Sequence, residues 1–249
     1  MTHRFFIPSN WLTPPTVHLH DEAAHQVKAV LRLQPGDEII VLDNSGQERR
    51  VRLTAVGQRE VAGEIISQQP AQGEPAVQIS LYQGTLKGQK FEWVLQKGTE
   101  LGVSRFRPVI CQRSVVNKPH DLVEKYPRWE RIIREAAEQS RRGRLPELAA
   151  PLTLAETLES LGGSTLPGAL ALMPWEEAGE PSLKTILAQV KPRQVIIFIG
   201  PEGGFTTQEA ALAQAAGVRL VKLGPRILRA ETAGLAVCAA ILYEVGEWG

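Results

Sequence analysis

The stretch Val195–Val245, which reads VIIFIGPEGGF, TTQEAALAQAAG, VRLVKLGPRILRAETAGL and AVCAAILYEV, decides the fold of this chain. Its first residues, Val195–Ile199, are β-branched or aromatic, as in a strand that is buried on both faces. The segment Gly200–Gly204 contains three glycines, which permit a sharp turn and the close approach of a ligand. Thr206 and Glu209 then form a capping box, which predicts the start of a helix. Strand, glycine turn and helix together predict an open α/β sheet with a ligand crevice at its strand ends.

The same order of features repeats immediately downstream. Val218–Leu223 predicts a second short strand, Gly224-Pro225 a second loop, and the residues from about Ala230 to Val245 a helix. Neither loop has the spacing of a known phosphate-binding motif, and a tight turn explains either loop alone. Two such loops, with Glu202 and Arg229 at the strand ends, favour a binding site.

The composition, 43% hydrophobic and 22% charged over 249 residues, is typical of a globular protein of one or two domains. No apolar run approaches the roughly 18 residues that are needed to cross a membrane. The N-terminus lacks the apolar core of a signal peptide, so we expect a cytoplasmic protein. Cys111 and Cys238 lie in apolar sequence and are predicted to be buried, inert thiols. The scattered histidines and cysteines predict no metal site.

The net charge of +1 conceals a basic middle segment. Residues 87–144 contain 14 lysines and arginines against 7 acidic residues. A basic segment in a nearly neutral protein indicates a patch that binds a polyanion. The alternative is an ordinary solvated helix face.

The chain is predicted to form two domains. Residues 1–70 contain several short strands with turn residues between them, which predicts a small β-barrel. Residues 71–76 form a linker with Pro, Gly and polar residues. In residues 77–249 strands alternate with helices, which predicts an α/β domain with a mostly parallel sheet. Within it, one long helix is expected from about Asp121 to Arg142.

Two segments, IGPEGG at 199–204 and LGPRILRAETA at 223–233, resemble the glycine-loop motifs of the SPOUT methyltransferases. Within that family the chain is most similar to the bacterial 16S rRNA uridine-N3 methyltransferases. Four more segments agree: RFF at 4–6, VLR at 30–32, QKGTELGV at 96–103 and EQSRRGRLPE at 138–147. The resemblance therefore covers nearly the whole chain in the right order, which is more specific than either loop alone.

This resemblance implies a fold and an activity. The first domain would be a PUA-like RNA-binding barrel, and the second a SPOUT domain with a deep trefoil knot near its C-terminus. The family binds S-adenosylmethionine in the knot and works as a homodimer with the active site at the subunit interface. Its product is 3-methyluridine at position 1498 of 16S rRNA in the small ribosomal subunit.

The resemblance also assigns roles to matching positions. The chemistry of methylation at uracil N3, rather than the resemblance, indicates two catalytic residues: Arg229 as a cation that stabilises the uracil anion, and Glu202 as a base, although its place near a helix N-terminus should lower its pKa and weaken it in that role. The alternative for Arg229 is a helix-entry arginine that pairs with Glu202 or Glu231. The segment Trp175-Glu176-Glu177 departs from the family pattern. The cofactor-binding residues would be Leu172, Met173, Gly200, Pro201, Glu202, Gly203, Leu223, Gly224, Ile227, Leu228 and Thr232, and the RNA-binding residues Arg4, Arg32, Lys97, Arg113, Arg134, Arg141 and Arg142.

Three other functions remain open at this point. The first is methylation of another RNA, such as tRNA. The second is a non-catalytic RNA-binding factor in ribosome assembly, and the intact glycine loops argue against it. The third is an α/β enzyme that uses a nucleotide ligand to modify a small molecule, which leaves the basic segment and the barrel unexplained.

Overall fold

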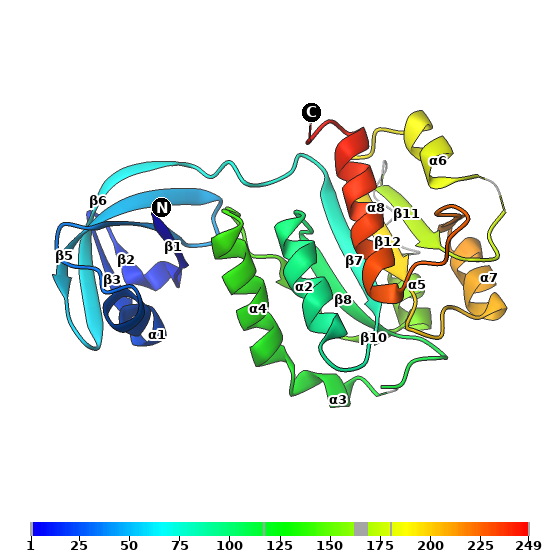
Figure 1. Cartoon of the computed structure of the whole chain (residues 1–249), viewed down its shortest axis with the longest axis horizontal. Helices are drawn as coiled ribbons and strands as arrows, with labels where there is room; N and C mark the ends of the chain where they lie inside the picture. The colour runs from blue at the N-terminus through cyan, green and yellow to red at the C-terminus, as the bar shows by residue number, and fades with distance from the viewer. Residues whose placement is uncertain (1, 117, 162–168, 180, 249) are drawn as a thin grey trace. The chain divides into compact units, whose positions relative to one another are not determined.

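Two units, each with its own hydrophobic core, make up the structure, a computed structural model that describes residues 2–116, 118–161, 169–179 and 181–248 (Figure 1). Unit 1 consists of the residues up to Glu74 together with Arg134–Leu145, and unit 2 consists of Pro75–Ile133 and the residues from Pro146 onward. None of the described helices is long and apolar enough to cross a membrane.

Unit 1 is built on a six-stranded sheet in the order β1-β4-β5-β6-β3-β2. All of its pairings are antiparallel except the parallel pair of β1 and β4. The mostly β character that was predicted for this part of the chain is confirmed. Alternate strand residues, such as Ile39 and Val41, are buried in its core. The elements are β1 (His3–Phe6), η1 (Ser9–Trp11), β2 (Leu12–Thr13), β3 (Thr16–His20), α1 (Asp21–His25), η2 (Gln26–Val30), β4 (Glu38–Leu42), β5 (Gln47–Val56) and β6 (Glu60–Pro70).

Unit 2 contains a seven-stranded sheet whose pairings among the described residues are all parallel, and this confirms the prediction of a mostly parallel sheet. The strand order is β10-β8-β7-β12-β11-β13, with β9 also paired to β8. The carboxyl ends of all these strands therefore meet at one edge, where open α/β sheets bind ligands. The strands are β7 (Gln78–Gly84), β8 (Arg105–Ile110), β9 (Glu147–Leu148), β10 (Leu152–Thr153), β11 (Ala169–Pro174), β12 (Gln194–Ile199) and β13 (Arg219–Val221).

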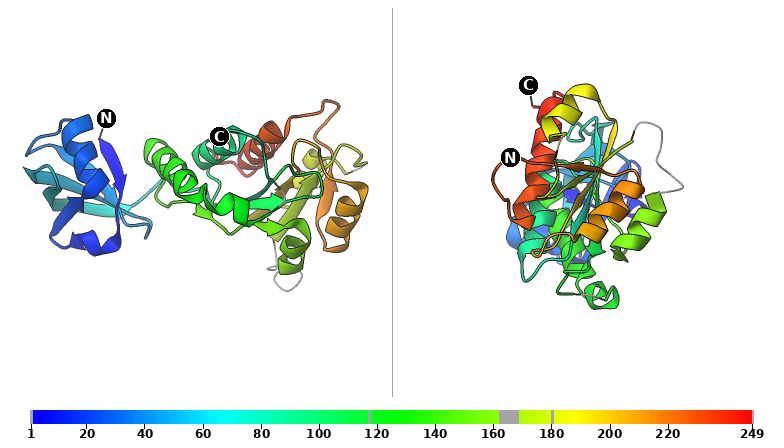
Figure 2. Two further views of the ribbon diagram at one scale, coloured as in Figure 1. Left: turned by 90° about the horizontal axis from the view of Figure 1, so that it is seen from below. Right: turned by 90° about the vertical axis from the view of Figure 1, so that its right-hand side faces the viewer.

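Helices cover both faces of this sheet (Figure 2). Helices α2, α6 and α8 lie on one face, and α5 and α7 lie on the other. Both faces of the central strands are consequently buried, which explains why they read as continuous apolar runs. The helices of unit 2 are α2 (Lys90–Glu100), α3 (His120–Val123), the first half of α4 (Tyr126–Gln139), α5 (Leu154–Leu161), α6 (Leu183–Gln189), α7 (Thr207–Ala215) and α8 (Ala230–Glu244).

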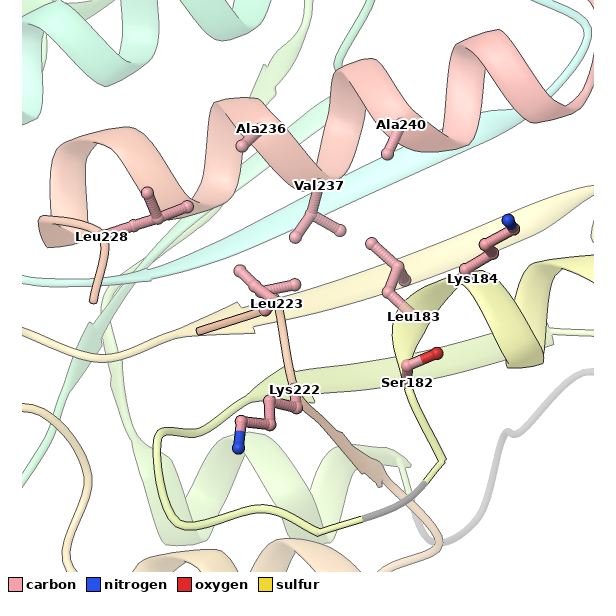
Figure 3. A pocket seen from close by; sticks show the side chains of 10 residues that line it. Ser182, Leu183, Lys184, Lys222, Leu223, Leu228, Ala236, Val237 and Ala240 are labelled. Atoms are coloured by element: carbon pink, nitrogen blue, oxygen red, sulfur yellow. The ribbon is translucent and has the colours of Figure 1, made fainter. Parts of the chain in front are cut away.

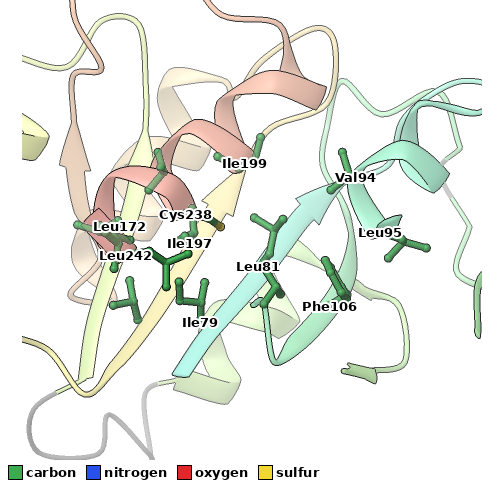
Figure 4. Close-up of a cluster of buried hydrophobic side chains, with 14 of the residues drawn as sticks. Ile79, Leu81, Val94, Leu95, Phe106, Leu172, Ile197, Ile199, Cys238 and Leu242 are labelled. Carbon is green, nitrogen blue, oxygen red and sulfur yellow. The ribbon is translucent and has the colours of Figure 1, made fainter. Parts of the chain in front are cut away.

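The two faces of β12 show this packing directly. Ile197 and Ile199 belong to the core beneath α2 and α8, together with Leu81 and Cys238 (Figure 4). Phe198 faces the opposite side and packs with residues of α5 and α7. A strand that is fixed on both faces is a rigid base for the loop that leaves its carboxyl end.

The prediction of one long helix from Asp121 to Arg142 is wrong. The structure has two helices, α3 and α4, which are separated at Glu124-Lys125. Pro127 explains the break, because proline lacks the amide hydrogen that an interior helical position needs and fits only the first turn. Helix α4 ends at Gln139, and Arg141 then adopts a positive φ of 62°.

The chain doubles back in the C-terminal part of unit 2. From β12 it runs through α7 to β13, which lies beyond β11 at the end of the sheet. It then returns, because α8 packs against β7 and β12 in the middle of the sheet. The segment 222–229 makes this return and therefore crosses the strand ends, and such a crossing is what the predicted knot requires.

Candidate active site

The first glycine loop connects β12 to α7 as the sequence predicts. Thr206 Oγ1 accepts a hydrogen bond from the Glu209 amide at 3.2 Å, and Glu209 Oε2 accepts one from the Thr206 amide at 2.8 Å. These two bonds complete the capping box. Glu209 Oε1 also accepts from the Gln112 amide at 2.8 Å, which ties the start of α7 to the loop after β8. The α7 end of the first glycine loop is therefore fixed by three hydrogen bonds.

Gly84, at the end of β7, allows this loop to approach closely. A Cβ at position 84 would lie 2.4 Å from the Pro201 nitrogen and 2.6 Å from the Gly200 carbonyl carbon, so only glycine fits. The neighbouring side chain of Gln83 is buried, and its Nε2 donates to the carbonyl oxygens of Gly84 at 3.1 Å and Gly200 at 3.3 Å. The sequence carries no signal for a role of either residue, because the contact joins positions more than 100 residues apart.

Glu202 is held by the segment that leads into α2. Its Oε1 accepts from the Lys87 amide at 3.0 Å and lies 3.5 Å from Lys90 Nζ. Burial alone would raise the pKa of Glu202, but these hydrogen bonds and the Lys90 charge lower it below its ordinary value. Lys90 Nζ also lies 3.7 Å from a carboxylate oxygen of Glu231 in α8. Lys90 therefore joins the loop to the last helix, and Glu202 is a weaker base than an ordinary glutamate.

The second glycine loop borders two open cavities, of about 330 and 440 Å³. Gly224 has a φ of 113°, and no atom lies within 4 Å of where its Cβ would be, so its backbone is open to the cavity. In the smaller cavity the side chains of Leu183, Leu223 and Val237 point toward one another (Figure 3). Both cavities are lined by Lys222, Leu223, Gly224 and Leu228. The larger one is also lined by Pro174, Trp175, Glu176, Pro225, Arg226, Ile227 and Ala233.

The predicted cofactor-binding residues fall into three groups. The residues that line the cavities are Leu223, Gly224, Ile227 and Leu228. Those at other described positions near the strand ends are Gly200, Pro201, Glu202 and Gly203 of the first loop, and the exposed Thr232 of α8. Leu172 and Met173 are fully buried in the two cores of the sheet. The residues that line the larger cavity are instead the ones just after their strand, β11, namely Trp175 and Glu176. Both belong to the segment that departs from the family pattern.

Arg229 is the residue before α8, and its side chain is exposed. Its carbonyl oxygen accepts from the amides of Thr232 and Ala233, which fixes the backbone at the helix entry. Among the described residues, the Arg229 guanidinium forms no ion pair with Glu202 or Glu231, both of which lie near Lys90 instead. The alternative role as a paired helix-entry arginine is thus not what the structure shows.

Two of the predicted RNA-binding residues are engaged inside unit 1. Arg142 is 2% exposed, and its Nε and Nη2 donate to the two carboxylate oxygens of Glu74 at 2.9 and 2.8 Å. Arg4 Nη1 lies 2.8 Å from Glu48 in a pair that is also largely buried. Because buried, paired guanidinium groups are not free to bind phosphate, the structure gives these two residues a role in holding unit 1 together.

The other predicted RNA-binding residues lie at the surface. Arg32 and Arg141 are exposed and both have positive φ angles. Arg113 donates to the Gly203 carbonyl oxygen at 2.8 Å, which brings it to the first glycine loop. Arg134 donates to the Phe6 carbonyl oxygen at 3.0 Å, and Lys97 pairs with Glu100 at 2.7 Å.

The two cysteines are free and buried, as predicted. Burial raises the pKa of both thiols, that of Cys238 to about 12. Neither thiol is therefore ionised near neutral pH, which excludes a thiolate nucleophile at these positions.

The parallel sheet with two glycine loops at its carboxyl edge fits the predicted class, the RNA methyltransferases, and comparisons with known proteins agree with this class. Residues 73–242 match the RNA methyltransferase domain family, and residues 19–66 match the RNA methyltransferase PUA domain. Since the first match covers more than half of the chain, the chain belongs to the RNA methyltransferase family.

Two relatives and one solved structure share a name. The ribosomal RNA small subunit methyltransferase E of Synechocystis is 36% identical over 97% of this chain and 77% of that protein. The protein of the same name from Bacillus subtilis is 34% identical over 92% of this chain and 91% of that protein. A crystal structure of the Neisseria gonorrhoeae protein of this name, bound to S-adenosylmethionine, matches with a TM-score of 0.88 and 31% identity over 100% of both chains.

Proposed function

We propose that this protein transfers a methyl group from S-adenosylmethionine to RNA of the small ribosomal subunit. The observation that carries the proposal is the cavity beside Gly224 at the carboxyl edge of a parallel sheet, with the exposed Arg229 at the end of the same loop. We place the target at N3 of the uridine at position 1498 of 16S rRNA and the enzyme in the cytoplasm.

The residues around the second glycine loop fit such a cofactor. The larger cavity, about 440 Å³, is in the usual range for small-molecule sites. It combines apolar side chains with the open backbone of Gly224, and backbone N–H and C=O groups suit the edge of an adenine ring. Bound S-adenosylmethionine supplies an electrophilic methyl group on its sulfonium. The relatives with this cofactor are the Neisseria gonorrhoeae protein and a putative methyltransferase from Legionella pneumophila, 28% identical with a TM-score of 0.84 over 98% of both chains.

The chemistry of uracil N3 assigns different roles to Arg229 and Glu202. Loss of the imide proton to solvent water leaves an anion that spreads onto the two flanking carbonyl oxygens, where a fixed cation stabilises it. Arg229 is an exposed cation without a competing carboxylate among the described residues. Glu202 has a lowered pKa and is already held by Lys87 and Lys90. We therefore assign Arg229 to the anion and Glu202 to positioning the loop.

We further propose that unit 1 binds the rRNA, with the exposed Arg32 and Arg141 among its contacts, and that the linker 71–76 marks the boundary of the domains. In unit 2, Arg113 beside the first loop is our candidate for phosphate contact. We also propose that the protein works as a homodimer. Its support is the exposure of three large apolar side chains along and next to α8, namely Ile227, Tyr243 and Trp248.

The test measures cofactor binding and methyl transfer separately. Calorimetric titration with S-adenosylmethionine should show binding at one site per chain, and Leu228→Arg should abolish it by filling the cavity with a charge. Labelled methyl groups should then appear on small subunits that lack the modification and not on tRNA. Tight cofactor binding without label on any RNA would contradict the proposal.

A further inference from the structure

Trp93 is a half-exposed aromatic residue on α2 that no part of the proposed mechanism uses. Its exposed fraction is 52%, whereas Phe91, Val94 and Leu95 on the same helix are buried in the core. Single exposed apolar residues are ordinary. The residues around Trp93 on the helix surface, however, are not the apolar ones expected at the edge of a hydrophobic core.

The residues three and four positions from Trp93 share its helix face and are all polar or cationic. They are Gln89, Lys90, Gln96 and Lys97, and the acidic residue of this face, Glu100, lies one turn further along the helix. Lys97 Nζ lies 5.2 Å from the centre of the Trp93 ring, and its ion pair with Glu100 at 2.7 Å holds it there. Lys97 covers one face of the indole, and the part of the ring that stays exposed offers stacking to a base, with amide groups and a cation beside it.

This face begins at the candidate active site. Lys90 contacts both Glu202 of the first glycine loop and Glu231 of α8, at 3.5 and 3.7 Å. Trp93 follows Lys90 by three residues, or about 4.5 Å along the helix axis. A strand of RNA that places one nucleotide at the site can therefore reach the indole with a neighbouring nucleotide.

We propose that Trp93 stacks on a base of single-stranded RNA that flanks the methylated uridine, with Lys90 and Lys97 beside the backbone phosphates. The inference rests on the proposed function and adds a substrate contact to it. Aromatic platforms between basic residues are the common means of binding single-stranded RNA. A second copy of this chain fits less well, because lysine is depleted in the cores of protein–protein interfaces.

The experiment compares Trp93→Ala and Trp93→Phe with Leu212→Ala, a control that truncates a side chain 56% exposed on α7. The probe is a fluorescein-labelled oligouridylate, with binding measured by anisotropy, followed by methyl transfer to small subunits. Loss of one stacked base weakens binding about 10-fold or more. Trp93→Ala should therefore raise the Kd and the KM about 10-fold at unchanged kcat, while Trp93→Phe and Leu212→Ala should stay within about 2-fold of the wild type.

Two results would overturn the inference. One is an unchanged Kd and KM for Trp93→Ala, and the other is a shift of Trp93→Ala toward monomer in sedimentation at unchanged RNA affinity, which would make this face an interface between copies. Failure of the proposed function is distinguishable, because RNA affinity needs no methyl transfer. If no variant or wild type methylates RNA but Trp93→Ala binds the oligonucleotide more weakly, the binding surface stands and the enzymatic assignment falls.

Discussion

Replacing Gly84 by alanine should displace the first glycine loop. The new Cβ would lie 2.4 Å from the Pro201 nitrogen, whereas ordinary van der Waals contact begins at 3.4 Å, so the backbone must move by about 1 Å. Overpacking of this kind costs about 1–3 kcal/mol, and each kcal/mol lowers the Tm by about 2–4 °C in a chain of this size. A displacement of about 1 Å at a reacting site can also reduce the rate by about 100-fold.

The assay is thermal unfolding together with single-turnover methyl transfer. Gly179→Ala is the matched control, because its Cβ would meet no atom within 4 Å and its φ is not positive. We expect the control to behave as the wild type. A Gly84→Ala protein with the wild-type Tm, cofactor affinity and rate would show that the contact with Pro201 does not position the loop.

Three further predictions concern single side chains. Arg229→Ala should lower kcat by about 10²–10³-fold at unchanged cofactor affinity, because an oriented charge stabilises the uracil anion; equal kcat would exclude the role. Burial raises the pKa of Glu138 to about 7, although the Phe6 amide and a nearby arginine oppose this. The folded protein thus holds this proton more tightly than the unfolded chain does. Its contribution to the free energy of unfolding is fully present below about pH 4.5 and is lost as the pH rises through 7. Denaturant titrations should show Glu138→Gln gaining up to about 3 kcal/mol over the wild type across that window; parallel pH curves would contradict it. Glu74→Ala should cost about 3 kcal/mol by removing the carboxylate from the buried Arg142, and an unchanged Tm would refute that role.

Local features of the fold were predictable from the sequence because their causes are local. The capping box of Thr206 and Glu209 involves residues three positions apart, and the apolar run Val195–Ile199 needs only its own composition to indicate a buried strand. The error at the long helix was local as well. Pro127 by itself indicates that a helix begins close to it. The apolar stripe continues on both sides of this proline, however, and therefore suggests one uninterrupted helix.

Contacts between distant segments could not be predicted in this way. The position of β12 between β7 and β11 depends on how the helices pack on both faces of the sheet. The composition of each strand does not encode the order of the strands in the sheet. For the same reason the approach of Gly84 to Pro201 left no signal in the sequence. Arg142 was read as a phosphate contact because it stands in a basic run, yet the partner that buries it, Glu74, is 68 residues away.

The most direct test of the proposed activity is to locate the methyl group. Small subunits that lack the modification are incubated with the protein and labelled S-adenosylmethionine, and the 16S rRNA is digested and mapped by mass spectrometry. The structure-based account predicts a single new methyl group, on N3 of the uridine at position 1498, which disappears with Arg229→Ala. A methyl group on another base or another RNA, or none at all, would contradict it.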